Sequence, residues 1–322
     1  SIVMNKKKGS ENMDKKELQN PALYTNRELS WLLFNKRVLS EARDKQLLLF
    51  ERLKFLSITA SNLDEFFMVR IGSLVDMIHA EYTKKDIAGM SAKEQLDALM
   101  EETHKFAALQ YSTYNRMLLP QLRANGLNFV EHHEQLTERQ AQYVDEYFEE
   151  NVYPVLTPMA VDSSRPFPLI RNKTLNIGAL VAKKGEKDTE IEFATVQVPS
   201  VLPRVVRIPA AKEGDTEVAV LLLEEIIERN ISKLFLNYNV LCAHPFRITR
   251  NADLAIDEDE AEDLLLEIEK QIKKRTWGQA IRLEIEAAAD RRLLKILCRE
   301  LSVRKEDVFE IDGPLDLTFL MK

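Results

Sequence analysis

The hydrophobic and polar positions of the first third of the chain repeat with the period of a helix. Three segments carry an apolar residue at every third or fourth position, as one buried helix face requires. We expect helices that begin after Asn26, over Leu48–Thr59, and from Ser91 to just before Gly126. The expected core positions are Leu29, Leu32, Leu33, Val38, Leu39, Phe50, Leu53, Phe55, Leu56, Leu96, Leu99, Met100, Phe106, Leu109 and Met117. No strand-like alternation interrupts them, so the pattern predicts a helical bundle.

The stretch Ser61–Arg70 has the pattern of a helix start. Asn62 stands at the expected N-cap, and Glu65 completes a capping-box-like pair three residues later. This helix should run to about His79, with Asn62 where free backbone N–H groups and the helix dipole favour an anion. A cap alone contributes roughly 1 kcal/mol and needs no ligand. From the residues alone, the purely structural role of Asn62 is favoured.

After Gly126 the pattern changes to short alternating segments mixed with helices. Expected helices run from Thr137 to about Asn151 and over Leu222–Leu236, Asp257–Arg275 and Asp290–Leu301. Expected strands are Leu127–Val130, Asn176–Ala182, Ile191–Val198, Val205–Ile208, Phe246–Thr249, Ile281–Glu286 and Val308–Ile311. The residues between Ala182 and Ile191 should form a hairpin-like turn, and prolines exclude a helix over Pro154–Pro168. This mixture indicates an α+β unit.

The predicted fold class is therefore multidomain, α and α+β. We expect a flexible tail over residues 1–22, a helical N-terminal domain over 23–126, and an α+β head domain with a mixed sheet over 127–314. The apolar segment 315–322 follows a turn and stops, so we expect it to begin a further, truncated domain.

Composition and charge narrow the classes of function. The 322 residues are 45% hydrophobic and 30% charged, which suits globular domains with real cores. A net charge of −7 disfavours sequence-independent binding to nucleic acid, which needs a basic surface. The sequence contains no run of 18 apolar residues, so it predicts no membrane span. Two distant cysteines, Cys242 and Cys298, favour a reduced, cytoplasmic setting.

Few residues suggest catalysis or metal binding. Neither usual glycine-rich phosphate loop is present. The pair His132–His133 beside Glu134 could suggest a metal, but adjacent side chains diverge and no third ligand is evident, so a solvated loop is favoured. We expect His244 to serve packing. The histidines are His79, His104, His132, His133 and His244.

Arg247 and Arg250 form the best candidate for an anion contact in the second half of the chain. The alternative is a pair of surface arginines with a local carboxylate partner such as Asp253, and the abundance of such pairs favours it. Trp31 and Trp277 are expected to be packing anchors, because no second aromatic residue brackets either one in the sequence.

Several multi-residue motifs, in this order, resemble the N-terminal and head domains of the bacterial polyphosphate kinases, type one. The N-terminal motifs are Glu28–Leu32 with Phe34–Leu39, Glu51–Leu56, and Ser61–Phe66 with Val69 and Arg70. The head-domain motifs are Pro154–Pro158 with Phe167 and Pro168, Phe246–Leu254, and Gly313–Leu317. The resemblance runs from about Leu23 to Lys322.

The resemblance implies an enzyme that reversibly transfers the terminal phosphate of ATP to inorganic polyphosphate through a phosphohistidine, with Mg²⁺. In that family the catalytic histidines belong to two C-terminal domains of phospholipase-D-like fold. They would lie beyond Lys322, so no catalytic residue and no metal ligand is expected here, and this chain alone should be inactive. Asn62 matches the family's nucleotide-contacting asparagine, which implies an ATP contact on the base side.

The implied partners are ATP or ADP, polyphosphate, the C-terminal catalytic domains and further copies of the chain, because the family's head domain contributes to dimers. The implied location is cytoplasmic, or peripheral to a membrane within a complex. A competing hypothesis is a non-catalytic oligomeric interaction scaffold in which Asn62 is only a cap.

Overall fold

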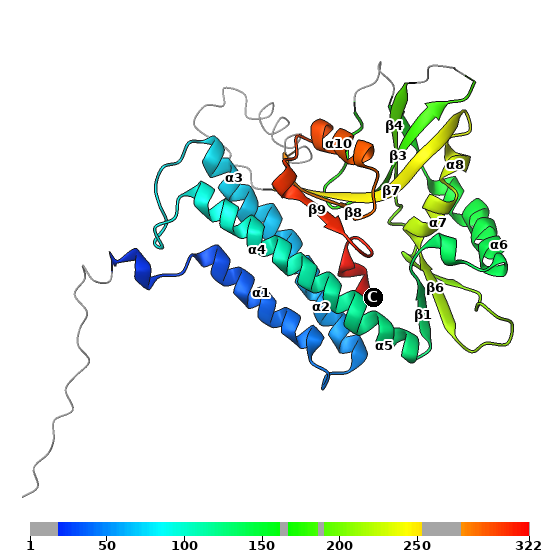
Figure 1. Ribbon diagram of the computed structural model, residues 1–322, viewed down its shortest axis with the longest axis horizontal. Helices are drawn as coiled ribbons and strands as arrows, with labels where there is room; N and C mark the ends of the chain where they lie inside the picture. Colours follow the sequence, from blue (N-terminus) through cyan, green and yellow to red (C-terminus); the bar gives the residue numbers. More distant parts are fainter. Residues whose placement is uncertain (1–18, 162–166, 186–189, 253–277, 322) are drawn as a thin grey trace, which may run out of the picture.

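The computed structural model describes residues 19–161, 167–185, 190–252 and 278–321. Long helices dominate its first third and lie side by side in Figure 1 (blue to cyan), with the strands beyond them. The helices there are α1 (Arg27–Arg43), α2 (Leu49–Glu65), α3 (Gly72–His79), α4 (Ala92–Thr113) and α5 (Leu119–Ala124). The predicted helical bundle is confirmed.

Capping side chains begin two of these helices where the sequence predicts. The Asn26 side chain accepts hydrogen bonds from the backbone N–H groups of Glu28 and Leu29, at 3.0 and 2.9 Å. Ser91 and Glu94 form a reciprocal capping box at the start of α4. These contacts satisfy backbone donors that a helix N-terminus otherwise leaves unpaired.

The predicted helix start at Asn62 is wrong. α2 continues past Thr59, and Asn62 lies in its last turns. No Gly or Pro occurs between Leu49 and Ile71, so nothing stops the helix. A wide π-helical turn, Phe66–Ile71, then joins α2 to α3. Asn62 therefore meets no free backbone N–H groups, and Glu65 is an exposed helical residue without a capping role.

Two expected core residues of the bundle are exposed. Leu33 retains 52% and Phe50 63% of their accessible surface. Each helix buries one stripe of apolar side chains against its neighbours. In α1 this stripe contains Leu32 and Leu39, and in α2 it contains Leu53 and Leu56. Leu33 and Phe50 lie outside that stripe.

The remaining described residues form two sheets with flanking helices, so the predicted α+β unit with a mixed sheet is confirmed. The larger sheet has the order β2-β4-β3-β7-β8-β9, and the smaller has the order β1-β6-β5. The pairs β8–β9 and β1–β6 are parallel, whereas the other pairs are antiparallel. The strands are β1 (Leu127–Val130), β2 (Met159–Val161), β3 (Leu175–Lys183), β4 (Ile191–Gln197), β5 (Val205–Ile208), β6 (Val218–Leu222), β7 (Tyr238–Arg250), β8 (Ala280–Glu286) and β9 (Val308–Ile311).

Some boundaries in this unit differ from the prediction. The expected helix over Leu222–Leu236 is divided by Asn230 and is preceded by β6, which the sequence pattern did not predict. β7 begins eight residues before the expected strand at Phe246. A short 3-10 turn, Tyr153–Val155, occurs in the proline-rich connection. The helices are α6 (Glu138–Tyr147), α7 (Leu223–Arg229), α8 (Ile231–Leu234) and α10 (Arg291–Glu300). The helix expected over Asp257–Arg275, like Asp253 and Trp277, lies outside the described residues.

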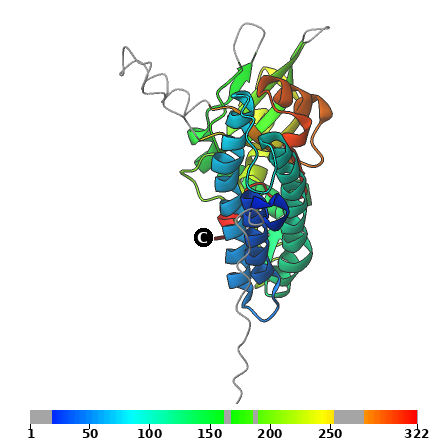
Figure 2. The same ribbon diagram turned by 90° about the vertical axis from the view of Figure 1, so that its left-hand side faces the viewer.

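The last described residues return to the helical bundle. Leu315 and Leu317 are buried, and the Ser57 hydroxyl donates to the Thr318 carbonyl at 3.0 Å. In Figure 2 the axes of the long helices are roughly aligned, and the sheets lie toward one end of the bundle. Among the described helices, none combines the length and the apolar character that a bilayer span requires.

Candidate functional site

Asn62 lies in a regular antiparallel pairing of α1 with α2. The Trp31 ring stacks on Phe66, with ring centroids 4.5 Å apart. One turn along, the Asn62 Nδ2 atom donates to the Asn35 Oδ1 atom at 3.0 Å. Trp31 is thus a packing anchor as expected, although its aromatic partner is distant in sequence. The sequence did not indicate this pairing, because it depends on the register of two helices.

Buried neighbours hold the Asn62 amide in place. Asn35 is fully buried, and its Nδ2 atom donates to the Thr59 carbonyl at 3.2 Å. Gln110 supports Thr59 in turn, through a 2.9 Å hydrogen bond from Nε2 to the hydroxyl. Asn62 itself is partly exposed, and its Oδ1 atom accepts no hydrogen bond from the residues that the structure describes. A preoriented carbonyl oxygen is therefore available to a ligand N–H group.

Two residues further on, Asp64 points into the larger sheet. Its carboxylate pairs with Arg247 of β7 and Arg282 of β8. Glu284 of β8 approaches the same arginines, at 2.7 Å from Arg247 and 3.1 Å from Arg282. We call these four residues the Asp64 cluster. Each of the four side chains retains less than 10% of its accessible surface, so the cluster is a buried joint between the helical bundle and the sheet.

The electrostatics of the Asp64 cluster favour its charged form. Burial opposes ionisation of Asp64, but the adjacent Arg247 and Arg282 outweigh it and lower the pKa to about 2. Asp64 and Glu284 keep the pKa of Arg247 above its ordinary value despite burial. Two guanidinium groups thus face two carboxylates in a site from which water is largely excluded.

Neither sequence-based interpretation of Arg247 and Arg250 is correct. Both residues are buried, at 2% and 9% exposure, so they are neither a surface pair nor an open anion contact. The Arg250 guanidinium donates to the carbonyls of Ile170 and Gly278, at 3.0 and 2.7 Å. Arg247 pairs with Asp64, which lies 183 positions earlier in the chain. A partner at that separation leaves no signal in the local sequence pattern.

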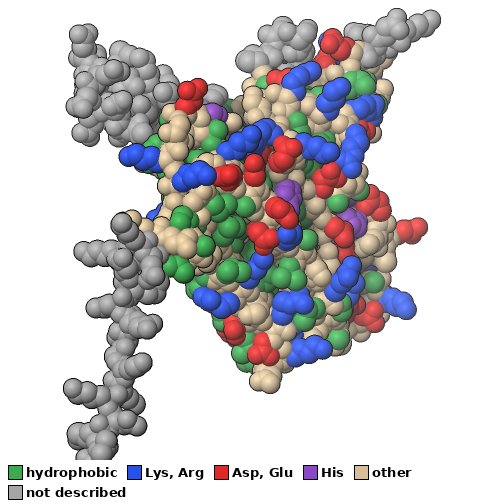
Figure 3. Space-filling model, turned by 60° about the vertical axis from the view of Figure 1, so that its left-hand side comes forward, with side chains coloured by type: hydrophobic (Ala, Val, Ile, Leu, Met, Phe, Trp, Pro, Cys, Tyr) green, Lys and Arg blue, Asp and Glu red, His purple; other side chains and the backbone are tan. Residues whose placement is uncertain are grey.

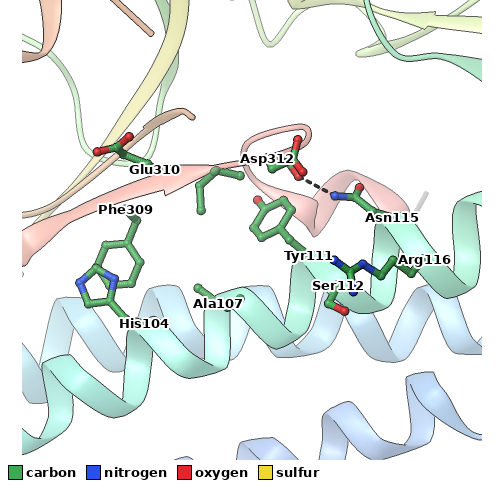
Figure 4. Close-up of a pocket in the computed structure, with 11 residues that line it drawn as sticks. His104, Ala107, Tyr111, Ser112, Asn115, Arg116, Phe309, Glu310 and Asp312 are labelled. Atoms are coloured by element: carbon green, nitrogen blue, oxygen red, sulfur yellow. Dashed lines mark hydrogen bonds between the residues drawn. The ribbon is translucent and has the colours of Figure 1, made fainter. Parts of the chain in front are cut away.

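A groove of about 400 Å³ runs between α4 and β9. Figure 4 shows the His104 and Phe309 rings facing each other, and their centroids lie 3.9 Å apart. Asn115 Nδ2 donates to the Asp312 carbonyl at 2.7 Å. The Tyr111 hydroxyl donates to the Pro314 carbonyl at 2.9 Å. These side chains connect α4 and the turn after it to β9 and the residues that follow it. The groove therefore lies along a second contact between the bundle and the α+β unit.

A third group of polar residues combines three histidines that the sequence singled out with three glutamates that it did not. It consists of His132, His133, Glu225, Glu228, His244 and Glu286, which we call the His–Glu cluster. Four separate segments contribute to it, namely the loop after β1, α7, β7 and β8. Only His132 and His133 are neighbours in sequence, which is why no spacing motif indicated the cluster.

The two adjacent histidines converge on one carboxylate. His133 Nδ1 lies 3.2 Å from one Glu225 oxygen, and His132 Nδ1 lies 3.7 Å from the other. The expectation of diverging side chains in a solvated loop is therefore wrong, because a short 3-10 turn at His133–Gln135 follows His132 and breaks the regular backbone. His244 also does more than pack, since its Nδ1 atom lies 2.8 Å from Glu286.

The His–Glu cluster differs electrostatically from the Asp64 cluster. Burial opposes ionisation of Glu225, but contacts with His132 and His133 lower its pKa to about 2. Burial, followed by the charges of Glu225 and Glu286, raises the pKa of Glu228 to about 9. The Glu228 side chain makes no ion pair or hydrogen bond within the part of the chain that the structure describes.

The fold alone defines a class of protein, in which buried ion pairs join a helical bundle to an α+β unit with a mixed sheet. Comparison with known families identifies that class. Residues 24–130 match the polyphosphate kinase N-terminal domain, and residues 139–322 match the polyphosphate kinase middle domain. The chain therefore belongs to the polyphosphate kinase family.

Similar proteins agree with this assignment. The polyphosphate kinase of Halalkalibacterium halodurans is 48% identical over 308 residues, which are 95% of this chain and 43% of that protein. That of Synechocystis sp. is 41% identical over 308 residues, covering 94% and 42%. The crystal structure of polyphosphate kinase from Porphyromonas gingivalis matches with a TM-score of 0.73 and 26% identity, covering 92% of this chain and 40% of that chain. The chain thus spans less than half the length of these relatives.

Proposed function

We propose that this chain is the ATP-side and assembly part of a polyphosphate kinase, and that Asn62 contacts the base of ATP. The observation that carries the proposal is the Asn62 amide, which is fixed by Asn35 while its Oδ1 atom stays available. An adenine base carries an amino group, which can donate to such an acceptor. A site that is already oriented loses less entropy when the ligand binds.

The Asp64 cluster supports this role by positioning Asn62. The two residues lie in the same turn of α2, and Asp64 binds α2 to β7 and β8. A nucleotide on the α1–α2 surface would consequently have a fixed position relative to the α+β unit. Small displacements of a bound substrate slow phosphoryl transfer, because catalysis there depends mainly on positioning and on charge stabilisation.

The remaining steps of the proposed reaction belong to parts of the relatives that this chain does not cover. We propose that the terminal phosphate of ATP passes to polyphosphate through a phosphohistidine there, with Mg²⁺ stabilising the transferred charge. Mg²⁺ prefers oxygen ligands, and each possible three-residue metal group in the described residues includes a histidine. These residues do not fit Mg²⁺, and we assign the ion to none of them.

Assembly into homo-oligomers is the second part of the proposal. We propose that the helical unit 23–126 binds the nucleotide and that the α+β unit 127–314 contacts a second copy of the chain. Val201 and Leu236 of this unit retain 79% and 69% of their surface, so large apolar side chains are available there for contact with a second copy. Sedimentation of the complete enzyme should show a dimer or larger species, and a monomer at micromolar concentration would refute this part.

The test of the nucleotide contact is Asn62→Ala in the complete enzyme. Loss of one hydrogen bond to the base costs about 1 kcal/mol, so the KM for ATP should rise about fivefold, with a smaller change in kcat. The matched control is Ser61→Ala, an exposed neighbour on the same helix. Thermal unfolding of both variants separates a binding defect from a folding defect. Unchanged ATP kinetics with a lowered Tm would assign Asn62 to the α1–α2 pairing alone, as the non-catalytic scaffold hypothesis requires.

A further inference from the structure

The His–Glu cluster contains a compact set of metal-ligand atoms on rigid elements. Glu228 lies in the last turn of α7, His244 on β7 and Glu286 at the end of the adjacent β8. One ligand atom from each of these residues lies within 4.8 Å of the other two. Ligand atoms around a tetrahedral ion with bonds of about 2.0–2.1 Å are roughly 3.3 Å apart. Small side-chain rotations would therefore close this set around one ion.

The charges of these three residues are not balanced by other parts of the described chain. His244 pairs with Glu286, and their side chains retain 17% and 21% of their surface. The Glu228 side chain has no hydrogen bond or ion pair within the described ranges, and no Lys or Arg there pairs with Glu286. Partly buried carboxylates without a cationic partner are costly. A divalent cation between them would give Glu228 the cationic partner that it lacks among the described residues.

The other possible sets are less suitable. Glu225 already accepts hydrogen bonds from the His133 backbone N–H, at 2.9 Å, and from its ring. The set His132, Glu134 and Glu225 includes side chains that retain 52% and 72% of their surface, at His132 and Glu134. Figure 3 shows one face of the molecule, where histidines (purple) lie beside Asp and Glu (red) on an open surface. Exposed side chains of this kind are mobile and coordinate weakly, because ordering them costs entropy.

We propose that Glu228, His244 and Glu286 bind one divalent transition-metal ion, with water completing the coordination. The mixed nitrogen and oxygen ligands suit ions such as Zn²⁺, whereas Mg²⁺ strongly prefers oxygen. The ion would join α7 to β7 and β8. It would thereby stabilise the α+β unit and would take no part in phosphoryl transfer. This site is separate from the proposed ATP contact and from the family's use of Mg²⁺, so either proposal can fail without the other.

The test is equilibrium dialysis of the EDTA-treated chain against micromolar Zn²⁺, with bound metal measured by atomic absorption. We expect about one tightly held Zn²⁺ per chain, retained in excess Mg²⁺. Glu228→Gln and His244→Ala should each weaken binding about tenfold or more, because a ligand is lost. The matched control His132→Ala removes a nearby histidine outside the set and should retain the ion. Circular dichroism verifies that each variant is folded.

A second measurement uses Co²⁺ in place of Zn²⁺ on the wild-type chain, so that the result does not depend on a variant folding. A visible absorption band of nitrogen- and oxygen-coordinated Co²⁺ is expected, and His244→Ala should lose it. Three results would overturn the proposal: no retained metal in the wild type, displacement of Zn²⁺ by Mg²⁺, or equal retention by His244→Ala and wild type. Loss of the ion in His132→Ala but not in His244→Ala would place the ion elsewhere and also overturn it.

Discussion

The Asp64 cluster and the His–Glu cluster both include residues of β7 and β8, yet their buried carboxylates are paired with cations in different ways. In the first, two arginines that remain charged face two carboxylates, and all four side chains are buried. In the second, the available cations are histidines, and His244 pairs with Glu286 while the Glu228 side chain has no ion-pair partner among the described residues. A balanced cluster serves as a joint. An unbalanced one can accept a cation from solution.

The largest effect should come from breaking the balance of the Asp64 cluster. Arg247→Met leaves Asp64 and Glu284 buried with one arginine between them. Removing one partner of a buried ion pair typically costs about 3–5 kcal/mol, because an uncompensated charge remains. Urea unfolding of the variant should show this loss in the free energy of unfolding.

The control for this experiment is Arg291→Met. Arg291 pairs with Glu310 at 2.7 Å, but the two side chains retain 70% and 38% of their surface. Exposed pairs contribute about 0–1 kcal/mol, so this variant should be nearly as stable as the wild type. Equal losses in the two variants would show that burial does not distinguish the Asp64 cluster from a surface pair.

The pH dependence of stability should identify Asp64 as the titrating member of the joint. Its pKa falls from an ordinary 3.8 to about 2 in the folded chain. A depressed carboxyl pKa contributes stability that is complete above the unfolded value and is lost as pH falls through the folded value. A shift of this size corresponds to ~2 kcal/mol. The stability difference between wild type and Asp64→Asn should therefore be constant above about pH 5 and shrink between pH 4 and pH 2.

Measurement of both proteins in the same buffers removes the contributions of carboxyl groups outside the Asp64 cluster, since these are common to the two. A difference that does not change with pH down to 2 would contradict the role of Asp64. A difference that falls near pH 6 would indicate a histidine instead.

Local patterns were sufficient for most of the fold. Asn26 and Ser91 cap helices as predicted, because a cap depends on neighbours within three residues. Helical periodicity could not reveal that α2 continues through Asn62, because a polar residue with capping propensity is also tolerated inside a helix. The same physics leaves Leu33 exposed: periodicity defines an apolar face, whereas the packing of neighbouring helices decides how wide a stripe is buried.

The candidate sites were much less predictable than the elements. The family motifs pointed to Asn62, but its contact with Asn35 depends on how α1 pairs with α2. Asp64 pairs with arginines 183 and 218 positions later in the chain, and the His–Glu cluster joins four segments. Sites assembled from distant strands and helices are determined by tertiary packing, and a single sequence carries no pairing information for them.

The smallest expected effect gives the most direct comparison, because one substitution can be made in both clusters. Glu284→Gln and Glu228→Gln each replace a carboxylate with a neutral side chain of nearly equal shape. Glu284 is paired with two arginines, so its variant should lose about 1–3 kcal/mol as a charge-assisted partner disappears.

Glu228 has no such partner within the described residues and lies near Glu225 and Glu286. Burial keeps the pKa of Glu228 at about 9, so this group is mostly neutral at pH 7 already, and metal-free Glu228→Gln should unfold within about 0.5 kcal/mol of the wild type or be slightly more stable. Urea unfolding in EDTA at pH 7 measures both variants under one condition. A loss at Glu228 as large as that at Glu284 would mean that the His–Glu cluster is already balanced, and that the two clusters do not differ in the way the structure indicates.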